Sequence, residues 1–237
     1  GNGTLYYIPT SLTKIIVTDD NQIKDYAFQN VNKVTEIIIP EGYHNPTNPN
    51  GISSAITYIG KSAFDNMTSL VKVNQAQDGK NVLYNTIETI ETQAFRDTKL
   101  SNITLPKALT KLGSYAFAAT SSTGNVNVLE SVIFTGTSLT NFENGLFYNQ
   151  VKLVNMSYYT YDANNNNEPI LHDVAKTVLV PESVTTIGNY VFFNDINIIN
   201  IVFSDNVTQF GTSVLGGTAM LETLTTPFIG NEFSDDI

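Results

Sequence analysis

The amino-acid sequence predicts an α/β solenoid, in which short repeats stack into a right-handed superhelix with one parallel β-sheet and with short helical or 3₁₀ turns on the opposite face. Two recurring motifs and their spacing lead to this prediction. An Ala-Phe pair preceded by Ile-Gly returns along the chain, a strand-like Leu-x-x-Ile-x-Leu segment follows it, and the shortest distance between copies is 22 residues. Self-similarity of this kind is the signature of stacked repeats.

The Ala-Phe motif fixes the frame of each repeat, or rung. It is clearest in Ile59–Phe64, Leu112–Phe117 and Ile187–Phe192. Copies 22 or 23 residues apart define the basic rung, and longer gaps indicate rungs that carry loops. The phenylalanine position is occupied by Phe28, Phe64, Phe95, Phe117, Phe147, Phe192 and, as a substitute, Leu215.

A short strand is predicted after each phenylalanine. Segments such as Val34–Ile39, Leu100–Leu105 and Ile198–Phe203 alternate apolar and polar positions and are rich in β-branched residues, as expected for a strand with one buried face. Because every rung presents its strand in the same direction, neighbouring strands must pair in parallel. Proline, which has no N–H, ends the ladder after several strands, at Pro40, Pro106, Pro181 and Pro227.

The return path to the next strand is predicted as a one-turn helix closed by asparagine or aspartate. These residue types tolerate a left-handed backbone, and they stand two positions after the phenylalanine at Asn30, Asn66, Asp97, Asn149 and Asn194. Ala119 breaks the pattern, so its rung is expected to turn differently. The glycine of Ile-Gly does not require a positive φ everywhere, because three rungs replace it with Lys24, Glu91 and Glu143.

The chain is predicted to form one solenoid domain over residues 1–237. We assign residues 1–22 to an N-terminal cap rung, 23–226 to the repeats and 227–237 to a C-terminal tail, and we expect the whole to be one module of a longer protein. Residues 153–192 are interpreted as two rungs, the second of which has lost its Ala-Phe turn to an insertion at Tyr161–Asp173. The alternative is that this insertion forms a β-hairpin arm projecting from a single rung.

These motifs resemble the BspA-type bacterial leucine-rich repeats, whose unit runs roughly Ile-Gly-x-x-Ala-Phe-x-x-Cys/Asn-x-x-Leu-x-x-Ile-x-Leu-Pro. Residues 95–106 and 109–117 follow this unit closely, and the resemblance covers residues 11–226, with Asn or Asp where that family often has Cys. It implies a leucine-rich-repeat solenoid that is secreted or displayed on the cell surface. Some members resemble adhesins that bind host matrix proteins, so the resemblance also implies a non-enzymatic role in adhesion.

The composition narrows the classes of partner. The chain has 237 residues, 41% of them hydrophobic, which is enough for one continuous core. Its formal net charge of −10 would repel a phosphate backbone or an anionic membrane surface, so we expect no nucleic-acid partner. No apolar run approaches the roughly 20 residues needed to cross a bilayer, so we expect no membrane insertion. The lack of cysteine rules out disulfides.

The sequence contains no recognisable catalytic constellation. The histidines, His44 and His172, lie in predicted insertions, and His172-Asp173 has no serine in a nucleophile elbow to complete a triad. The run Asp162–Glu168 is interpreted as an asparagine-rich loop, because it lacks the mid-loop glycine and the bidentate glutamate of an EF-hand, and calcium binding there is the alternative. We therefore predict no enzyme, no catalytic residue, no metal site and no cofactor.

The exposed face of the sheet is the first candidate binding surface. In Leu-x-x-Ile-x-Leu the x positions point away from the core, and equivalent residues of successive rungs stand in rows. Ile38, Ile133 and Ile199 would form an apolar contact patch if they lie next to one another. The candidate residues of this face are Thr35, Glu36, Ile38, Lys72, Asn74, Asn102, Thr104, Glu130, Ile133, Asn155, Ile199 and Asn200.

The tyrosine-rich insertion is the second candidate surface. Tyr159 and Tyr161 lead into it, and tyrosine rings suit protein contacts or stacking on sugars. We therefore expect an extracellular protein or glycan ligand, with adhesion to a host matrix or cell-surface protein through the sheet face as the first hypothesis. A carbohydrate-binding module that uses exposed Tyr159 and Tyr161 rings is one alternative, and a structural spacer of a larger surface protein is the other.

Overall fold

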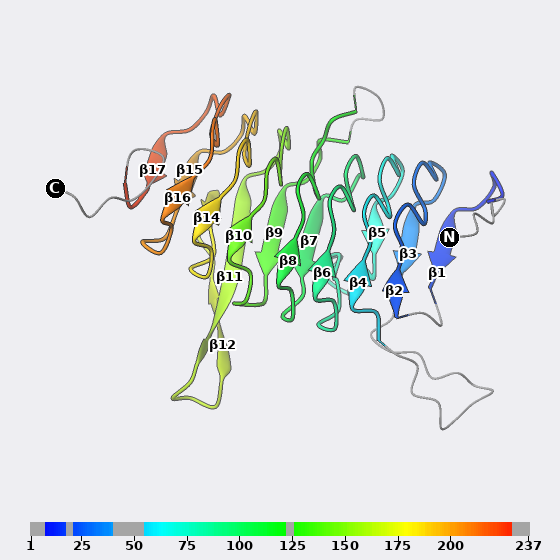
Figure 1. The fold of residues 1–237 in the computed structure, drawn as a ribbon, viewed down its shortest axis with the longest axis horizontal. Coiled ribbons are helices and arrows are strands. Elements are labelled where there is room, and N and C mark those ends of the chain that lie inside the picture. Colours follow the sequence, from blue (N-terminus) through cyan, green and yellow to red (C-terminus); the bar gives the residue numbers. More distant parts are fainter. Residues whose placement is uncertain (1–7, 18–20, 40–54, 122–125, 229–237) are drawn as a thin grey trace.

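The computed structural model describes residues 8–17, 21–39, 55–121 and 126–228. They stack as successive rungs of an elongated solenoid with two walls, from the N-terminal rung at one end to the C-terminal rung at the other (Figure 1). We call the wall formed by the Leu-x-x-Ile-x-Leu strands the sheet wall, and the wall that carries the Ala-Phe motifs the turn wall. Within the described ranges there is no helix that could cross a membrane. Pro40, His44 and most of the predicted tail lie outside these ranges.

The sheet wall confirms the predicted parallel strands. Its strands are β1 (Lys14–Ile16), β3 (Glu36–Ile38), β5 (Lys72–Val73), β7 (Asn102–Leu105), β9 (Ser131–Phe134), β11 (Asn155–Asp162), β12 (Glu168–His172), β13 (Thr177–Leu179), β15 (Asn200–Val202) and β17 (Thr223–Thr225). They form one sheet in the order β1-β3-β5 and a second in the order β7-β9-β11-β13-β15-β17, with β12 paired to β11 alone. Every pairing along these two paths is parallel.

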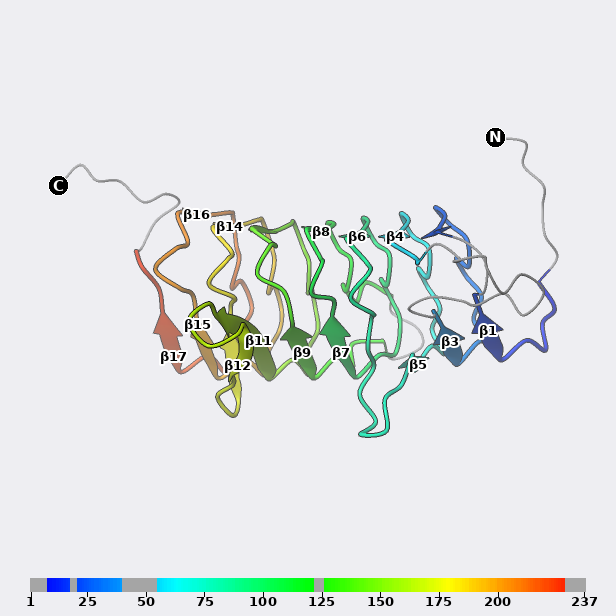
Figure 2. The same cartoon turned by 90° about the horizontal axis from the view of Figure 1, so that it is seen from below.

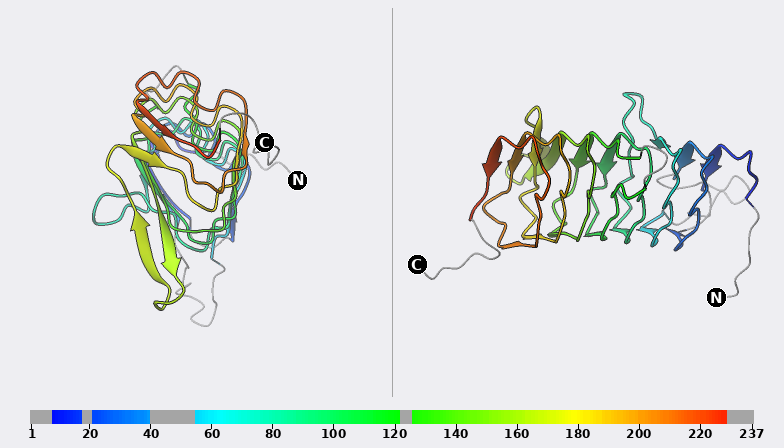
Figure 3. Two further views of the ribbon diagram at one scale, coloured as in Figure 1. Left: turned by 90° about the vertical axis from the view of Figure 1, so that its left-hand side faces the viewer. Right: turned by 90° about the horizontal axis from the view of Figure 1, so that it is seen from above.

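The turn wall carries a second set of parallel strands, so the prediction of a single sheet is wrong. Each of these strands has two residues and ends at or next to the Ile-Gly position. They form a sheet of β2 (Gln22–Ile23), β4 (Tyr58–Ile59), β6 (Thr89–Ile90) and β8 (Lys111–Leu112), and a sheet of β10 (Asn141–Phe142), β14 (Thr186–Ile187) and β16 (Gln209–Phe210). The left panel of Figure 3 looks along the stack and shows the rungs nearly superposed.

The predicted helical or 3₁₀ turns are wrong as well, because the Ala-Phe motif bonds to the next rung. The N–H groups of Ser62, Phe64 and Asn66 each donate to a carbonyl of the following rung at 2.9 Å. The N–H groups of Ala63 and Asp65, which lie between them, each donate three residues back within the turn at 3.2 Å. A helix would direct all its N–H groups along its own axis. The observed turns satisfy every second N–H through the neighbouring rung and so join the rungs together.

The asparagine and aspartate residues after the phenylalanine have the predicted left-handed backbone. Their φ angles lie between 56° and 64°, at Asn30, Asn66, Asp97, Asn149 and Asn194. A second left-handed position, two residues before the phenylalanine, was not predicted, and it is held by ordinary side chains such as Tyr115 and Tyr190. The glycine of Ile-Gly has a different role. A Cβ on Gly113 would lie 2.4 Å from the backbone N of Thr92, so this glycine permits close approach of two rungs.

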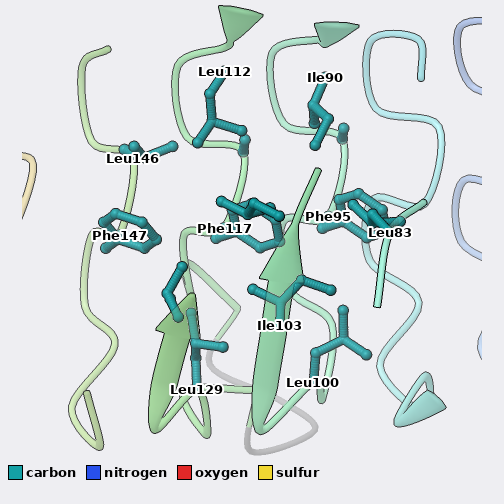
Figure 4. Packing of buried hydrophobic residues seen from close by; sticks show 14 of the residues in the cluster. Leu83, Ile90, Phe95, Leu100, Ile103, Leu112, Phe117, Leu129, Leu146 and Phe147 are labelled. Atoms are coloured by element: carbon teal, nitrogen blue, oxygen red, sulfur yellow. The ribbon is translucent and has the colours of Figure 1, made fainter. Parts of the chain in front are cut away.

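A column of phenylalanine rings forms the centre of the core. Phe64, Phe95 and Phe117 stack with ring centroids 5.0 and 5.3 Å apart, and each ring is buried. Ile90 and Ile103 close the core from the two walls on either side of these rings (Figure 4). The Ala-Phe repeat therefore fixes both the spacing of the rungs and the position of the largest buried side chains.

Besides the terminal strand β17, two segments of the sheet wall have no counterpart among the described strands of the turn wall. One is β13, which pairs with both β11 and β15. The other comprises residues 81–83, where Val82 bridges Thr104 and the side-chain Oδ1 of the buried Asn81 accepts a hydrogen bond from the Val73 N–H at 2.9 Å. The strand β13 confirms that residues 153–192 supply two rungs to the sheet. The insertion before it forms the antiparallel hairpin of β11 and β12, so both features that we treated as alternatives are present.

Asp195 is a buried carboxyl group in the core. Burial raises the pKa of Asp195 well above its ordinary value of 3.8, although a hydrogen bond from the Gln150 N–H at 2.6 Å acts in the opposite direction. Its second oxygen has no hydrogen-bond partner among the residues that the structure describes. Because the folded-state pKa is raised, the contribution of Asp195 to stability is fully present below its ordinary pKa and is lost as the pH rises from there through the folded-state pKa.

We therefore expect Asp195→Asn to be more stable than the wild type at pH 7, with a difference that shrinks as the pH falls toward 4. Urea unfolding of both proteins at several pH values measures this difference in the free energy of unfolding. A difference that does not change with pH would show that Asp195 is ionised in the folded state without penalty.

Candidate functional site

The strand register places the predicted sheet-face residues in three rows. Thr35, Glu130 and Ile199 precede their strands and form a row at the edge of the sheet. The first outward position holds Glu36, Lys72, Asn102, Asn155 and Asn200, and the third holds Ile38, Asn74, Thr104 and Ile133. The three isoleucines do not meet, because Ile199 lies in the edge row and several rungs separate Ile38 from Ile133.

The asparagines of this set have structural hydrogen bonds. Asn74 accepts from the Ile39 N–H at 2.6 Å, and Asn102 accepts from the Asn81 N–H at 2.8 Å. Asn155 and Asn200 donate to the residues around β13, to Asp173 at 2.9 Å and to the Lys176 carbonyl at 3.2 Å. These amides hold neighbouring rungs and loops in place, so their first role is in the scaffold.

A groove on the sheet wall brings together residues from both predicted surfaces. Its floor is formed by Thr104, Ile133 and Tyr159, from adjacent strands β7, β9 and β11. One side is formed by the loop of residues 74–80, and the other by the arm, which we define as residues 158–172 of the β11-β12 hairpin. Both project beyond the sheet wall (Figure 2 and the right panel of Figure 3), and the groove between them has a volume of about 430 Å³.

Local hydrogen bonds give the loop 74–80 a defined shape. The Ala76 N–H donates to the Lys80 carbonyl at 2.9 Å, and the Gly79 N–H donates back to Ala76 at 3.0 Å. Gly79 has a φ of 82°, which glycine adopts without strain. Asp78 caps the Lys80 N–H at 3.0 Å and lies 3.6 Å from its ammonium group. The loop therefore forms a compact side of the groove.

The arm turns one of its faces toward the groove. Tyr159 pairs with Leu171 and Tyr161 with Pro169, so these four side chains share a face. The Tyr161 hydroxyl donates to the Thr135 carbonyl at 2.5 Å. Burial raises the pKa of Tyr161, with a smaller contribution from Tyr159, so the hydroxyl stays protonated at neutral pH and keeps this hydrogen bond.

Lysine side chains give the groove local positive charge. The Lys107 ammonium lies 3.6 Å from the centroid of the Tyr161 ring, in a cation–π contact. Lys80 lies on the opposite side of the groove, and Asp78 is the one carboxylate among the lining residues. The groove thus combines an apolar and aromatic floor with two cationic groups, in a chain whose overall charge is −10.

His172 and the asparagine-rich loop have structural roles in the arm. His172 stacks on Tyr158 with ring centroids 4.7 Å apart, and its Nε2 lies 2.8 Å from the Thr160 hydroxyl. Asp162 caps the Asn164 N–H at 2.8 Å at the hairpin turn, where Asn166 and Asn167 have left-handed φ angles. Among the described residues there is no group of three acidic or histidine side chains placed to hold a metal ion.

Apart from Asn74, the loop 74–80 was not predicted as part of the site, and neither was Lys107. The Asp78-Gly79 pair is a typical turn signal and could have located the loop. Its closeness to the arm could not be predicted, because more than 80 residues separate Asp78 from Tyr161 and no local motif relates them.

Comparison with known proteins identifies the repeat. A family model described as the BspA type leucine rich repeat region, in 6 copies, matches residues 2–74, 47–160 and 129–236. No curated protein sequence matches the chain. Solved structures of bacterial leucine-rich repeat proteins share its fold.

The first is a leucine-rich repeat protein from Bacteroides ovatus, with a TM-score of 0.63 and 22% identity over 87% of this chain and 41% of that protein. The T. pallidum leucine rich repeat protein has a TM-score of 0.63 and 17% identity over 91% of this chain and 80% of its own. A leucine rich cell surface protein from Faecalibacterium prausnitzii has a TM-score of 0.52 and 15% identity over 90% of this chain and 59% of that protein. The chain thus spans less than half of the Bacteroides ovatus protein, and these identities show a common fold alone.

Proposed function

The chain belongs to the BspA-type leucine-rich repeat family, and on this premise we propose that it is a non-enzymatic interaction module of a bacterial surface protein. In this proposal it binds a host matrix or cell-surface protein through the groove on the sheet wall. The description of the Faecalibacterium prausnitzii relative as a cell surface protein supports the proposed location.

The observation that carries the proposal is the composition of the groove. Ile133 lies at its floor, flanked in register by Thr104 and Ser157, and the two sides rise from a scaffold whose backbone is bonded rung to rung. Apolar floors with polar edges on rigid scaffolds are typical of protein-binding sites. The arm adds Leu171, an exposed large apolar side chain on the same face of the hairpin as Tyr159.

The charges of the groove indicate the chemistry of the partner. Lys80 and Lys107 would favour a segment with acidic side chains, while the strong negative charge of the rest of the chain would repel acidic proteins elsewhere. We therefore propose that the partner inserts an extended segment with an apolar anchor and nearby acidic residues. The glycan alternative based on the insertion is not favoured, because Tyr159 and Tyr161 are half-buried and Lys107 covers one face of the Tyr161 ring.

Ile133→Asp is expected to weaken protein binding at least tenfold, because it places a carboxylate on the apolar floor of the groove. The control is Ile38→Asp, since Ile38 holds the same outward position of its strand, is also half-buried, and lies outside the groove. Purified protein is first tested against immobilised fibronectin, laminin, collagen and fibrinogen, and the variants are then measured against each protein that binds.

We expect saturable binding to at least one matrix protein, lost in Ile133→Asp and retained within about twofold in Ile38→Asp. Circular dichroism of both variants checks that the fold is kept. Equal losses in the two variants would place the binding site elsewhere, and no binding to any matrix protein would favour the structural-spacer alternative.

A further inference from the structure

A cluster of aromatic side chains lies on the turn wall, whereas the groove lies on the sheet wall. Tyr148 stacks on Phe193, with ring centroids 5.3 Å apart and planes 7° apart. Tyr190 meets Phe193 edge-on at 5.7 Å, and Tyr115 lies 6.1 Å from Tyr148. These four side chains come from three consecutive copies of the Ala-Phe motif and line an open cavity of about 630 Å³.

The repeats themselves show that the fold does not require these rings. Tyr148 and Phe193 occupy the position directly after the core phenylalanine, which holds Gln29, Asp65, Arg96 and Ala118 in the earlier rungs. Tyr115 and Tyr190 occupy the position two residues before it, which also holds Tyr26 in the first copy of the motif and is filled in the remaining copies with Ser62, Gln93, Gly145 and Ser213. Since the same turn forms with polar or small residues, the conformation of the turn does not depend on these rings.

Glycines let the rings lie flat against the next rung. A Cβ on Gly145 would come within 2.3 Å of the Tyr115 ring, and a Cβ on Gly216 within 2.8 Å of the Phe193 ring. The Tyr115 and Phe193 rings therefore lie close to the backbone of the next rung, and all four aromatic residues line the cavity. Tyr190 keeps 38% of its surface exposed.

Polar groups without charge surround the rings. The hydroxyls of Tyr115, Tyr148 and Tyr190 form no hydrogen bond within the described part of the chain. Asn194 donates to Asn149 at 2.5 Å and keeps a second N–H for a ligand. Among the residues that the structure describes, no charged side chain lines the cavity.

We propose that this cavity binds a neutral oligosaccharide. A sugar ring has a face of C–H groups, which the negative face of an aromatic ring attracts, and a rim of hydroxyls that needs donors and acceptors. The aromatic rings can contact the C–H face of a sugar. The tyrosine hydroxyls and the asparagine amides can donate hydrogen bonds to the sugar hydroxyls and accept hydrogen bonds from them. The absence of charged lining residues argues against an anionic or cationic ligand, which would need a counter-charge.

The test is binding of the purified chain to a panel of neutral oligosaccharides of the gluco, manno, galacto and N-acetylglucosamine series, followed by isothermal titration with each one that binds. Tyr190→Ala is compared with Tyr26→Ala. Tyr26 is a suitable control because it occupies the same repeat position, is 49% exposed and follows β2, the first strand of the turn wall, whereas the cavity residues follow β8, β10 and β14.

We expect saturable binding of at least one neutral oligosaccharide, at least tenfold weaker in Tyr190→Ala and unchanged within twofold in Tyr26→Ala. Ile133→Asp is expected to bind the same sugar as the wild type, which separates this site from the groove. Failure of the whole panel to bind at millimolar concentration, or equal losses in Tyr26→Ala and Tyr190→Ala, would overturn the proposal.

Discussion

Phe95→Ala is expected to lower the free energy of unfolding by about 3–5 kcal/mol, the usual cost of truncating a fully buried phenylalanine. Phe95 is 1% exposed and stacks between Phe64 and Phe117. The bonded turns on both sides fix the spacing of the rungs, so the neighbouring rings cannot close the resulting cavity.

Urea unfolding followed by circular dichroism measures this effect. Phe28→Ala is the matched control, because Phe28 holds the same repeat position but is half-buried and has a stacked ring on one side only. We expect its cost to be at least 1 kcal/mol smaller, in line with the smaller area it buries. Equal costs for the two variants would contradict a core built on a continuous column of rings.

Arg96→Ala is expected to lower the free energy of unfolding by roughly 2–3 kcal/mol, because it leaves a buried carboxylate without its cation. Both oxygens of Asp65 accept from Arg96 at 2.8 Å, and Gln29 donates to the same group at 2.9 Å. The Asp65 side chain is 2% exposed and that of Arg96 26%, so water partly replaces the guanidinium and the loss is below that of a fully buried pair.

The double variant Asp65→Ala with Arg96→Ala separates two contributions to the lost stability. One is the loss of the ion pair itself, and the other is the cost of leaving the Asp65 carboxylate buried without a cation. We expect it to recover at least half of the stability lost in Arg96→Ala, since the uncompensated carboxylate is gone. A double variant less stable than Arg96→Ala would mean that packing, not the buried charge, dominates at this position. Chemical unfolding of the single and double variants gives the comparison.

The repeat frame was predictable because it depends on side chains of a single rung. The buried positions, the parallel strands and the left-handed Asn66 and Asn194 follow from the spacing of apolar residues and from asparagine itself. The turn wall was not predictable in the same way. Its strands and turns depend on hydrogen bonds between rungs, such as that from the Phe64 N–H to the Ala94 carbonyl, and a single repeat cannot indicate these.

The candidate site was predictable only in part. Ile133, Tyr159 and Tyr161 were chosen from the sequence as members of two separate surfaces, and the structure brings them together. The side of the groove formed by the loop 74–80 depends on residues 81–83, which follow the loop and enter the sheet without an Ala-Phe motif. These residues therefore lack the sequence signal by which rungs are counted. Lys80 and Tyr161 line the same groove because the rungs that carry them stack next to one another, which no local sequence pattern indicates.

Hydrogen exchange of the chain, alone and bound to a matrix protein found in the binding assay, tests most directly whether the groove is the binding site. We expect slowed exchange in residues 76–83, 104–107, 131–135 and 159–171, which form the floor and sides of the groove. The turn wall should exchange as in the free protein. Protection confined to the turn wall, or spread evenly along the sheet wall, would contradict binding through the groove.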